Sequence, residues 1–239
     1  GFGATDDDRA GEIIAGNTFD YPYIHGSIML SLGHPFCSMS ASAFSSIYDK
    51  SDIAAEDMAP WVIDIICGKQ VTTDVGKNVP TRYGVFPTGL QNAVRKATVQ
   101  GSNIIISGAY IATDAWSSVY DLPSDEEYSS QAHEFCKSVL GYSWVTNRGT
   151  GSGRIAPAPE MGLTDTFSDC KGDNPCRPDG IKPADDNGSV LIRYDRTLTP
   201  AAVLFEGEGY KVASFGFPIE VLKSNEAREA LISRTLELF

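Results

Sequence analysis

Positive charge and histidine are scarce in this chain. Of its 239 residues, 19 are Lys or Arg, 31 are Asp or Glu and three are His, which gives a formal net charge of −12. Nucleic acid is therefore not an expected partner, because binding to phosphates requires clustered basic side chains. Long apolar runs are missing as well. No stretch approaches the roughly 20 apolar residues of a membrane helix, so we expect no membrane span within this sequence.

The usual signatures of cofactor and metal sites are also missing. The chain has neither the Gly-x-x-x-x-Gly-Lys-Ser/Thr phosphate loop nor a dinucleotide fingerprint, and we predict no cofactor. It has no pair of Cys-x-x-Cys or His-x-x-x-His spacings, and its acidic clusters do not match an EF-hand loop. We therefore predict no metal site.

The start of the sequence and its cysteines bear on the compartment. The sequence begins Gly1-Phe-Gly-Ala-Thr, without Met and without the basic and apolar regions of a signal peptide, so we interpret it as a piece of a longer protein. Cys170 and Cys176 bracket a short polar loop rich in turn formers, and we predict that they form a disulfide. A disulfide favours an exported protein, either periplasmic or at the cell surface. The other three cysteines are predicted to be buried free thiols: Cys37, Cys67 and Cys136.

Apolar periodicity predicts a single α/β domain over residues 1–239. Strands are predicted at 12–17, 35–40, 61–67, 102–108, 142–145, 189–194, 201–205 and 210–215, and helices at 20–33, 88–99, 125–140 and from about 224. Gly, Pro, Asp and Ser dominate residues 146–188, which we interpret as a long loop excursion. The alternation predicts an open, mostly parallel sheet with an antiparallel C-terminal edge.

The end of the chain, Tyr210-Lys-Val-Ala-Ser-Phe-Gly-Phe-Pro-Ile-Glu220, predicts a last buried strand and a tight exit loop. With the closing helix, this layout resembles the end of class I glutamine amidotransferase-like domains. The resemblance implies a flavodoxin-like three-layer sandwich. Catalytic members carry Phe-His-Pro-Glu in the exit loop, whereas this sequence has Phe217-Pro218-Ile219-Glu220 and no His there.

A second resemblance covers most of the chain. The matching pieces are 15–22 with His25 and Gly26, 63–70, 101–110, 208–212 and 216–220. Together they resemble exported bacterial proteins described as xanthan lyases or cell-surface lipoproteins. The resemblance implies a domain of an exported protein that acts on or binds a polysaccharide or peptidoglycan.

Glutaminase chemistry is not expected from these residues. It requires a Cys nucleophile on a strand-to-helix turn and a His activated by a carboxylate. The turn after the strand at 102–108 reads Ser107-Gly-Ala-Tyr110 and contains no Cys, and Pro218 stands where the His would be. The Gly-x-Ser-x-Gly elbow of serine hydrolases is absent as well.

Other polar residues are weak candidates for a site at the strand ends, where ligands of open α/β sheets bind. Asn17, Asp20 and His25 follow the first predicted strand, although Asp20 as a helix cap and His25 as a packed side chain is the interpretation we prefer. Lyases pair a Tyr or His base with Asn or Arg beside a uronate carboxylate. Candidates of these types, together with the exit-loop carboxylate, are Tyr110, Asn147, Arg148, Arg154 and Glu220.

Two functions follow as hypotheses. The first is a degenerate, non-amidotransferase domain that binds or scaffolds in polysaccharide or cell-envelope processing. The alternative is an active polysaccharide lyase or hydrolase, with a site around Asn17, His25, Tyr110 and Glu220.

Overall fold

The computed structural model describes most of the chain in nine segments. These are residues 21–49, 60–68, 70, 73–75, 81–116, 126–151, 153–163, 178–222 and 224–239. The predicted strand at 12–17 and the predicted disulfide between Cys170 and Cys176 lie outside the described residues.

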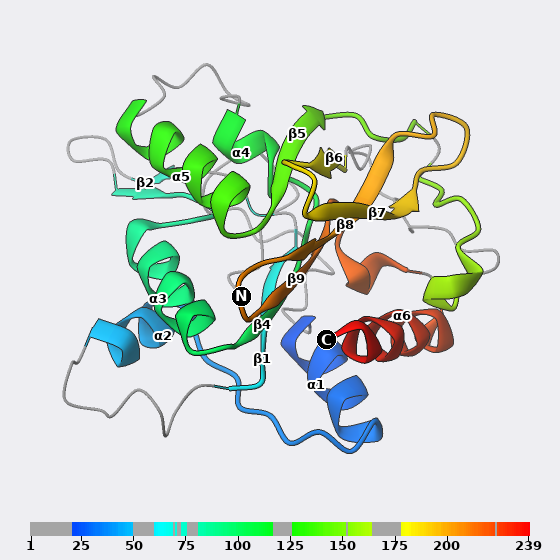
Figure 1. The fold of residues 1–239 in the computed structure, drawn as a ribbon, viewed down its shortest axis with the longest axis horizontal. Helices are drawn as coiled ribbons and strands as arrows, with labels where there is room; N and C mark the ends of the chain where they lie inside the picture. The colour runs from blue at the N-terminus through cyan, green and yellow to red at the C-terminus, as the bar shows by residue number, and fades with distance from the viewer. Residues whose placement is uncertain are drawn as a thin grey trace.

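A five-stranded sheet forms the centre of the protein (Figure 1). In spatial order its strands are β1 (Val62–Gly68), β4 (Asn103–Gly108), β9 (Lys211–Phe215), β8 (Pro200–Glu206) and β7 (Gly188–Arg193). β1 and β9 both pair with β4 in parallel, whereas β8 pairs antiparallel with both β9 and β7. The predicted α/β class is confirmed, with a parallel part of the sheet and antiparallel pairing by the C-terminal strands.

Helices lie on both faces of this sheet and bury two separate apolar cores (Figure 1). α3 (Thr88–Val99) and α5 (Glu126–Ser138) cover one face, and we call their contact with the sheet the first core. α1 (Tyr21–Ser31) and α6 (Asn225–Leu238) cover the other face and form the second core. The isoleucines of β4 show why both faces are covered, because Ile104 and Ile106 belong to the first core and Ile105 to the second.

The remaining described elements lie around this sandwich. They are α2 (Ala41–Asp49), α4 (Thr113–Trp116), the 3-10 turns η2 (Pro159–Met161) and η3 (Ile219–Val221), and two small antiparallel sheets that pair β2 (Thr73–Val75) with β3 (Thr81–Tyr83) and β5 (Tyr142–Thr146) with β6 (Gly180–Pro183). α2 packs on α3, where the Lys96 ammonium donates to the Tyr48 carbonyl at 2.7 Å.

The predicted strand at 35–40 is wrong. These residues form an irregular connection from α1 to α2 and pair with none of the strands that the structure describes. The Phe36 ring lies against Gly26 of α1, because a Cβ placed on Gly26 would be 2.3 Å from that ring. The Ser40 hydroxyl accepts the Ala43 N–H at 3.2 Å, so the polar end of this segment begins α2 instead of ending a strand.

Part of the predicted excursion at 146–188 is built into the fold. Ile155, Met161 and Leu163 are buried in the second core, and β6 lies within the excursion. Ile155, Met161 and Leu163 follow neither the helical nor the strand period, so the sequence pattern did not indicate that they would be buried.

Candidate functional site

The polar centre of the molecule is built around His25, in the second turn of α1. The helix ends where Gly33 takes a positive φ of 81° and the His34 N–H bonds to the Met29 carbonyl at 2.9 Å. His25 faces the sheet and is only 2% exposed. α1 contacts both β1 and η3, so the His25 side chain reaches the sheet as well as the loop that follows β9.

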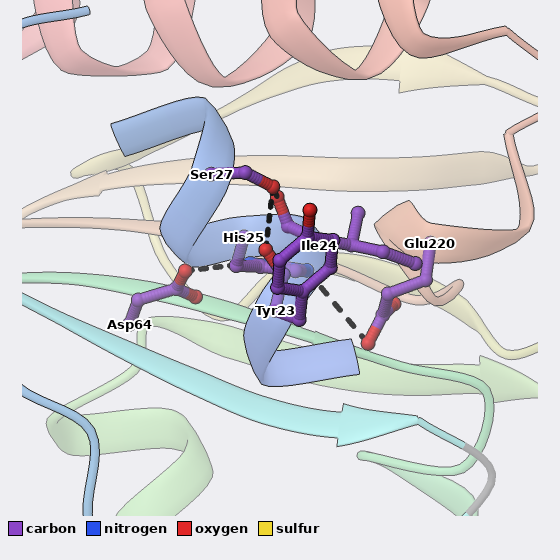
Figure 2. A network of polar contacts seen from close by, with 6 residues as sticks. All are labelled: Tyr23, Ile24, His25, Ser27, Asp64 and Glu220. Carbon is purple, nitrogen blue, oxygen red and sulfur yellow. Dashed lines mark hydrogen bonds and ion pairs between the residues drawn. The ribbon is translucent and has the colours of Figure 1, made fainter. Parts of the chain in front are cut away.

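Asp64 holds one side of the imidazole. It lies in β1 between Ile63 and Ile65, which pack against the first core, so strand alternation turns Asp64 toward α1. Its Oδ2 is 2.6 Å from His25 Nδ1, as the left dashed line of Figure 2 shows. A hydrogen bond this short between a carboxylate and an imidazole indicates a charge-assisted contact.

Glu220 lies on the other side of the ring. It belongs to η3, in the exit loop after β9, and its Oε1 is 3.7 Å from His25 Nε2 (Figure 2). Phe217, in the same exit loop, anchors the loop because its side chain is fully buried. The centre of its ring lies 5.8 Å from that of Phe215 and 6.3 Å from that of Tyr194. Glu220 itself is 4% exposed, so the carboxylate that the sequence placed in a tight exit loop is buried against α1.

These two carboxylates determine the charge of His25. Burial alone would lower the pKa of the imidazole, but Asp64 and then Glu220 outweigh it and raise the pKa to about 10. The ring is therefore an imidazolium at neutral pH, with both nitrogens protonated. In this state it can donate hydrogen bonds and balance negative charge, but it cannot accept a proton as a general base.

The structure thus brings together two of the sequence candidates, His25 and Glu220. The polar contacts of His25 go to Asp64 and Glu220 and do not include Tyr110, which lies partly buried in the turn after β4. Asn147 and Arg148 follow β5, where the Arg148 N–H bonds to the Thr146 hydroxyl at 3.2 Å. Neither of them contacts His25. Asn17 and Asp20 lie outside the described residues.

None of the three cysteines in the described part of the chain presents a thiolate to this centre. Cys67, at the end of β1, is buried, and burial followed by the charge of Glu220 raises its pKa far above the ordinary value. Cys136 is also buried, with a pKa raised to about 12 by burial. Both are the buried thiols that the sequence predicted, whereas that prediction is wrong for Cys37, which is exposed in the irregular 34–40 segment.

A second buried carboxylate closes the turn after β4, where an α/β hydrolase would hold its nucleophile. Asp179 Oδ2 accepts the backbone N–H groups of Ala112 and Thr113, both at 2.7 Å, and its Oδ1 accepts the Thr113 hydroxyl. Asp179 is fully buried, and burial raises its pKa to about 7 even though these hydrogen bonds favour the charged form. The Ala112 and Thr113 amides of this turn are therefore already bonded to a carboxyl group that the chain itself supplies.

Ser107, the last serine before that turn, is equally inaccessible. It shares the α1 face of β4 with Ile105 and is fully buried, and no described group bonds to its hydroxyl. A nucleophilic serine needs a base within hydrogen-bond reach. The hydrogen bond of His25 goes to Asp64 instead.

Two further features bear on the kind of site. Among the described residues no group of three or more His, Cys, Asp or Glu side chains has the arrangement of a metal site. Within the same part of the chain, every helix is too short or too polar to cross a bilayer.

Sequence reasoning missed both Asp64 and Asp179. Asp64 carried a signal, because an acidic residue inside the apolar run Val62-Ile-Asp-Ile-Ile66 must find a partner when the strand is buried. Asp179 carried none, since its partners are backbone amides some 66 residues earlier in the chain.

In comparisons with known proteins, no family model matches this sequence and no curated protein is significantly similar to it.

Proposed function

We propose that this chain is a degenerate, flavodoxin-like domain of the class I amidotransferase type that has no amidotransferase activity. It belongs to an exported protein and binds polysaccharide or peptidoglycan, or scaffolds their processing. The resemblance of residues 210–220 and of the pieces spread over 15–220 supports the family. The α/β sheet with a buried exit-loop carboxylate is compatible with it.

The observation that carries this proposal is the state of His25. A catalytic histidine must exchange a proton near neutral pH and must reach its substrate. His25 is buried and is held charged between Asp64 and Glu220. Its role is structural, because it joins α1, β1 and the exit loop by charge.

The buried carboxyl group of Asp179 at the turn after β4 supports the same proposal. Acyl-transfer enzymes leave backbone amides free at such a turn to stabilise a developing oxyanion. Here the Ala112 and Thr113 amides bind the carboxylate of Asp179. A substrate oxyanion would have to displace a buried group that makes three hydrogen bonds.

One experiment tests both this proposal and the alternative, a lyase or hydrolase of polysaccharide. Purified protein is assayed for ammonia release from glutamine, for loss of xanthan viscosity and for retarded migration in gels that contain xanthan or soluble peptidoglycan. We expect retardation without turnover. The control is His25→Gln, checked by circular dichroism for native secondary structure. Depolymerisation by the wild type that disappears in folded His25→Gln would replace the proposal with the enzymatic alternative.

A further inference from the structure

Arginines gather around the loop that joins β7 to β8, in a chain whose formal net charge is −12. This loop and the segment after β5, residues 193–199 and 146–156, contain one acidic residue, Asp195. They contain four arginines: Arg148, Arg154, Arg193 and Arg196. A positive surface on an acidic protein attracts anionic ligands to one place and repels them elsewhere.

Backbone pairing brings two of these arginines onto one surface. Ile155 pairs antiparallel with Tyr194, and both side chains are buried. Because side chains alternate along extended backbone, the flanking residues Arg154 and Arg193 lie on the opposite, outer face. Arg193 is exposed and Arg154 is partly buried. Backbone hydrogen bonds of 2.9 and 3.0 Å on either side of the buried pair hold this register.

The other two arginines are joined to the same surface by a threonine. The Thr197 hydroxyl donates to the Gly149 carbonyl at 2.7 Å, and this bond holds their chain neighbours Arg196 and Arg148 in adjoining turns. Both arginines are exposed. The four positive charges therefore come from two segments that lie far apart in the sequence and are fixed to each other by hydrogen bonds.

The loop has an unusual backbone. Arg196 and Leu198 have positive φ values of 65° and 54°, and no other non-glycine residue in the described part of the chain has a positive φ. Such conformations cost free energy and persist where surrounding contacts impose them, as at ligand clamps. The Leu198 carbonyl accepts from the Arg193 guanidinium at 3.0 Å, and its N–H bonds to the Tyr194 carbonyl at 3.1 Å. These contacts hold the loop in one shape, which lowers the entropy cost of binding.

The loop lies at the edge of the sheet where the parallel strands end. Phe215, the last residue of β9, pairs with Ala202 of β8, so β8 begins where β9 ends. The Tyr194 hydroxyl donates to the carbonyl of the next residue, Gly216, at 3.1 Å. Open α/β sheets bind ligands outside the carboxyl ends of their parallel strands. The arginines are therefore at the edge of the sheet where this class of fold binds ligands.

The chemistry of arginine indicates the kind of ligand. Guanidinium groups bind carboxylates and phosphates through paired N–H donors. Nucleic acid is a poor match, because a protein that binds it neutralises a run of phosphates along the backbone, and the net charge of −12 opposes that. Four arginines around one loop match a few separate carboxylates, as a glycan that contains uronic acid presents them.

We propose that Arg148, Arg193 and Arg196, with Arg154 beside them, bind the uronate carboxylates of an acidic polysaccharide. The inference rests on the proposed function and deepens it, because it assigns the class of glycan and the surface that binds it.

The test is affinity electrophoresis of the whole chain in gels that contain hyaluronan, in which glucuronate alternates with an uncharged sugar. A second gel contains the methyl ester of hyaluronan, which has the same backbone without the negative charges. We expect the acid to retard the wild type and the ester to leave its migration unchanged. Added salt should weaken the retardation, because exposed charges are screened.

Two double variants locate the site. Arg148→Gln with Arg196→Asn removes two of the arginines, and Asn tolerates the positive φ of residue 196. We expect roughly tenfold weaker binding of hyaluronan, at up to about 1 kcal/mol for each exposed ion pair. Lys137→Gln with Arg234→Gln removes the same charge from α5 and α6 and should bind like the wild type. Circular dichroism checks that both variants are folded.

The outcomes separate this inference from the proposed function. Glycan binding that the arginine variant retains, or equal binding of the acid and its ester, would overturn the inference and leave the proposed function standing. A wild type that is retarded by neither hyaluronan, xanthan nor soluble peptidoglycan would refute both. Stronger retardation by single-stranded DNA that the arginine variant loses would assign the arginines to nucleic acid and overturn the inference.

Discussion

Removing the charge of His25 should flatten the alkaline stability profile of the protein. The folded-state pKa is about 10 and the ordinary value is 6.5, and at 1.36 kcal/mol per pH unit this difference corresponds to about 5 kcal/mol of folding free energy. Because the folded-state pKa is the higher one, this contribution is complete below pH 6.5. It falls by about 1.4 kcal/mol per pH unit above that and is lost by pH 10.

The typical cost of breaking a buried ion pair is a free energy of the same size. Removing one partner of a buried ion pair typically costs about 3–5 kcal/mol, because the remaining charge is left without compensation. Both carboxylates stay behind when His25 is replaced, with Glu220 fully shielded and Asp64 largely so. His25→Gln should therefore cost several kcal/mol at neutral pH, and much less near pH 10.

The assay is urea unfolding of wild type and His25→Gln between pH 7 and 10, followed by the fluorescence of the three tryptophans. His133→Gln is the matched control. His133 lies in α5, where burial lowers its pKa, so it carries no charge to lose in this window. We expect the wild type and the control to lose stability in parallel while His25→Gln changes little. Parallel profiles for all three proteins would refute the reasoning.

Three further outcomes are expected. Asp179→Ala leaves two amides and one hydroxyl of the turn after β4 without their acceptor and should cost roughly 3 kcal/mol in urea unfolding, whereas Asp179→Asn keeps an acceptor and should cost less than half as much. Equal losses in the two variants would contradict the hydrogen-bond account. Gly216→Ala places a Cβ 2.4 Å from a backbone oxygen and should lower the melting temperature by several degrees; the control Gly151→Ala, with open space around it, should not. Alkylation of the native protein should modify exposed Cys37 and spare Cys67 until urea is added, as peptide mass spectrometry can check.

The long periodic segments of this fold were predictable from sequence. The helix predicted at 88–99 is α3, and the strand predicted at 102–108 is β4 to within one residue. α3 carries apolar residues at helical spacing, and β4 carries an apolar run because it is buried along its whole length. The predicted strand at 35–40 failed because its largest apolar residue, Phe36, lies against Gly26 of α1 and not in the sheet, which no local pattern reveals.

The site was only partly predictable, for a different reason. His25 and Glu220 were both candidates, but they lie far apart in the sequence, and their approach depends on α1 contacting both β1 and the exit loop. The charge of His25 depends on that approach. Whether a histidine acts as a base or as a structural cation is decided by its neighbours in space, and one of these, Asp64, was not a candidate at all.

The central claim is that His25 is a buried cation held between Asp64 and Glu220, and 15N NMR of the imidazole ring tests it most directly. At about pH 8 we expect both ring nitrogens to be protonated, followed by one transition near pH 10. A neutral ring at that pH, with a transition between about 6 and 7, would contradict the claim and return His25 to the set of possible catalytic bases.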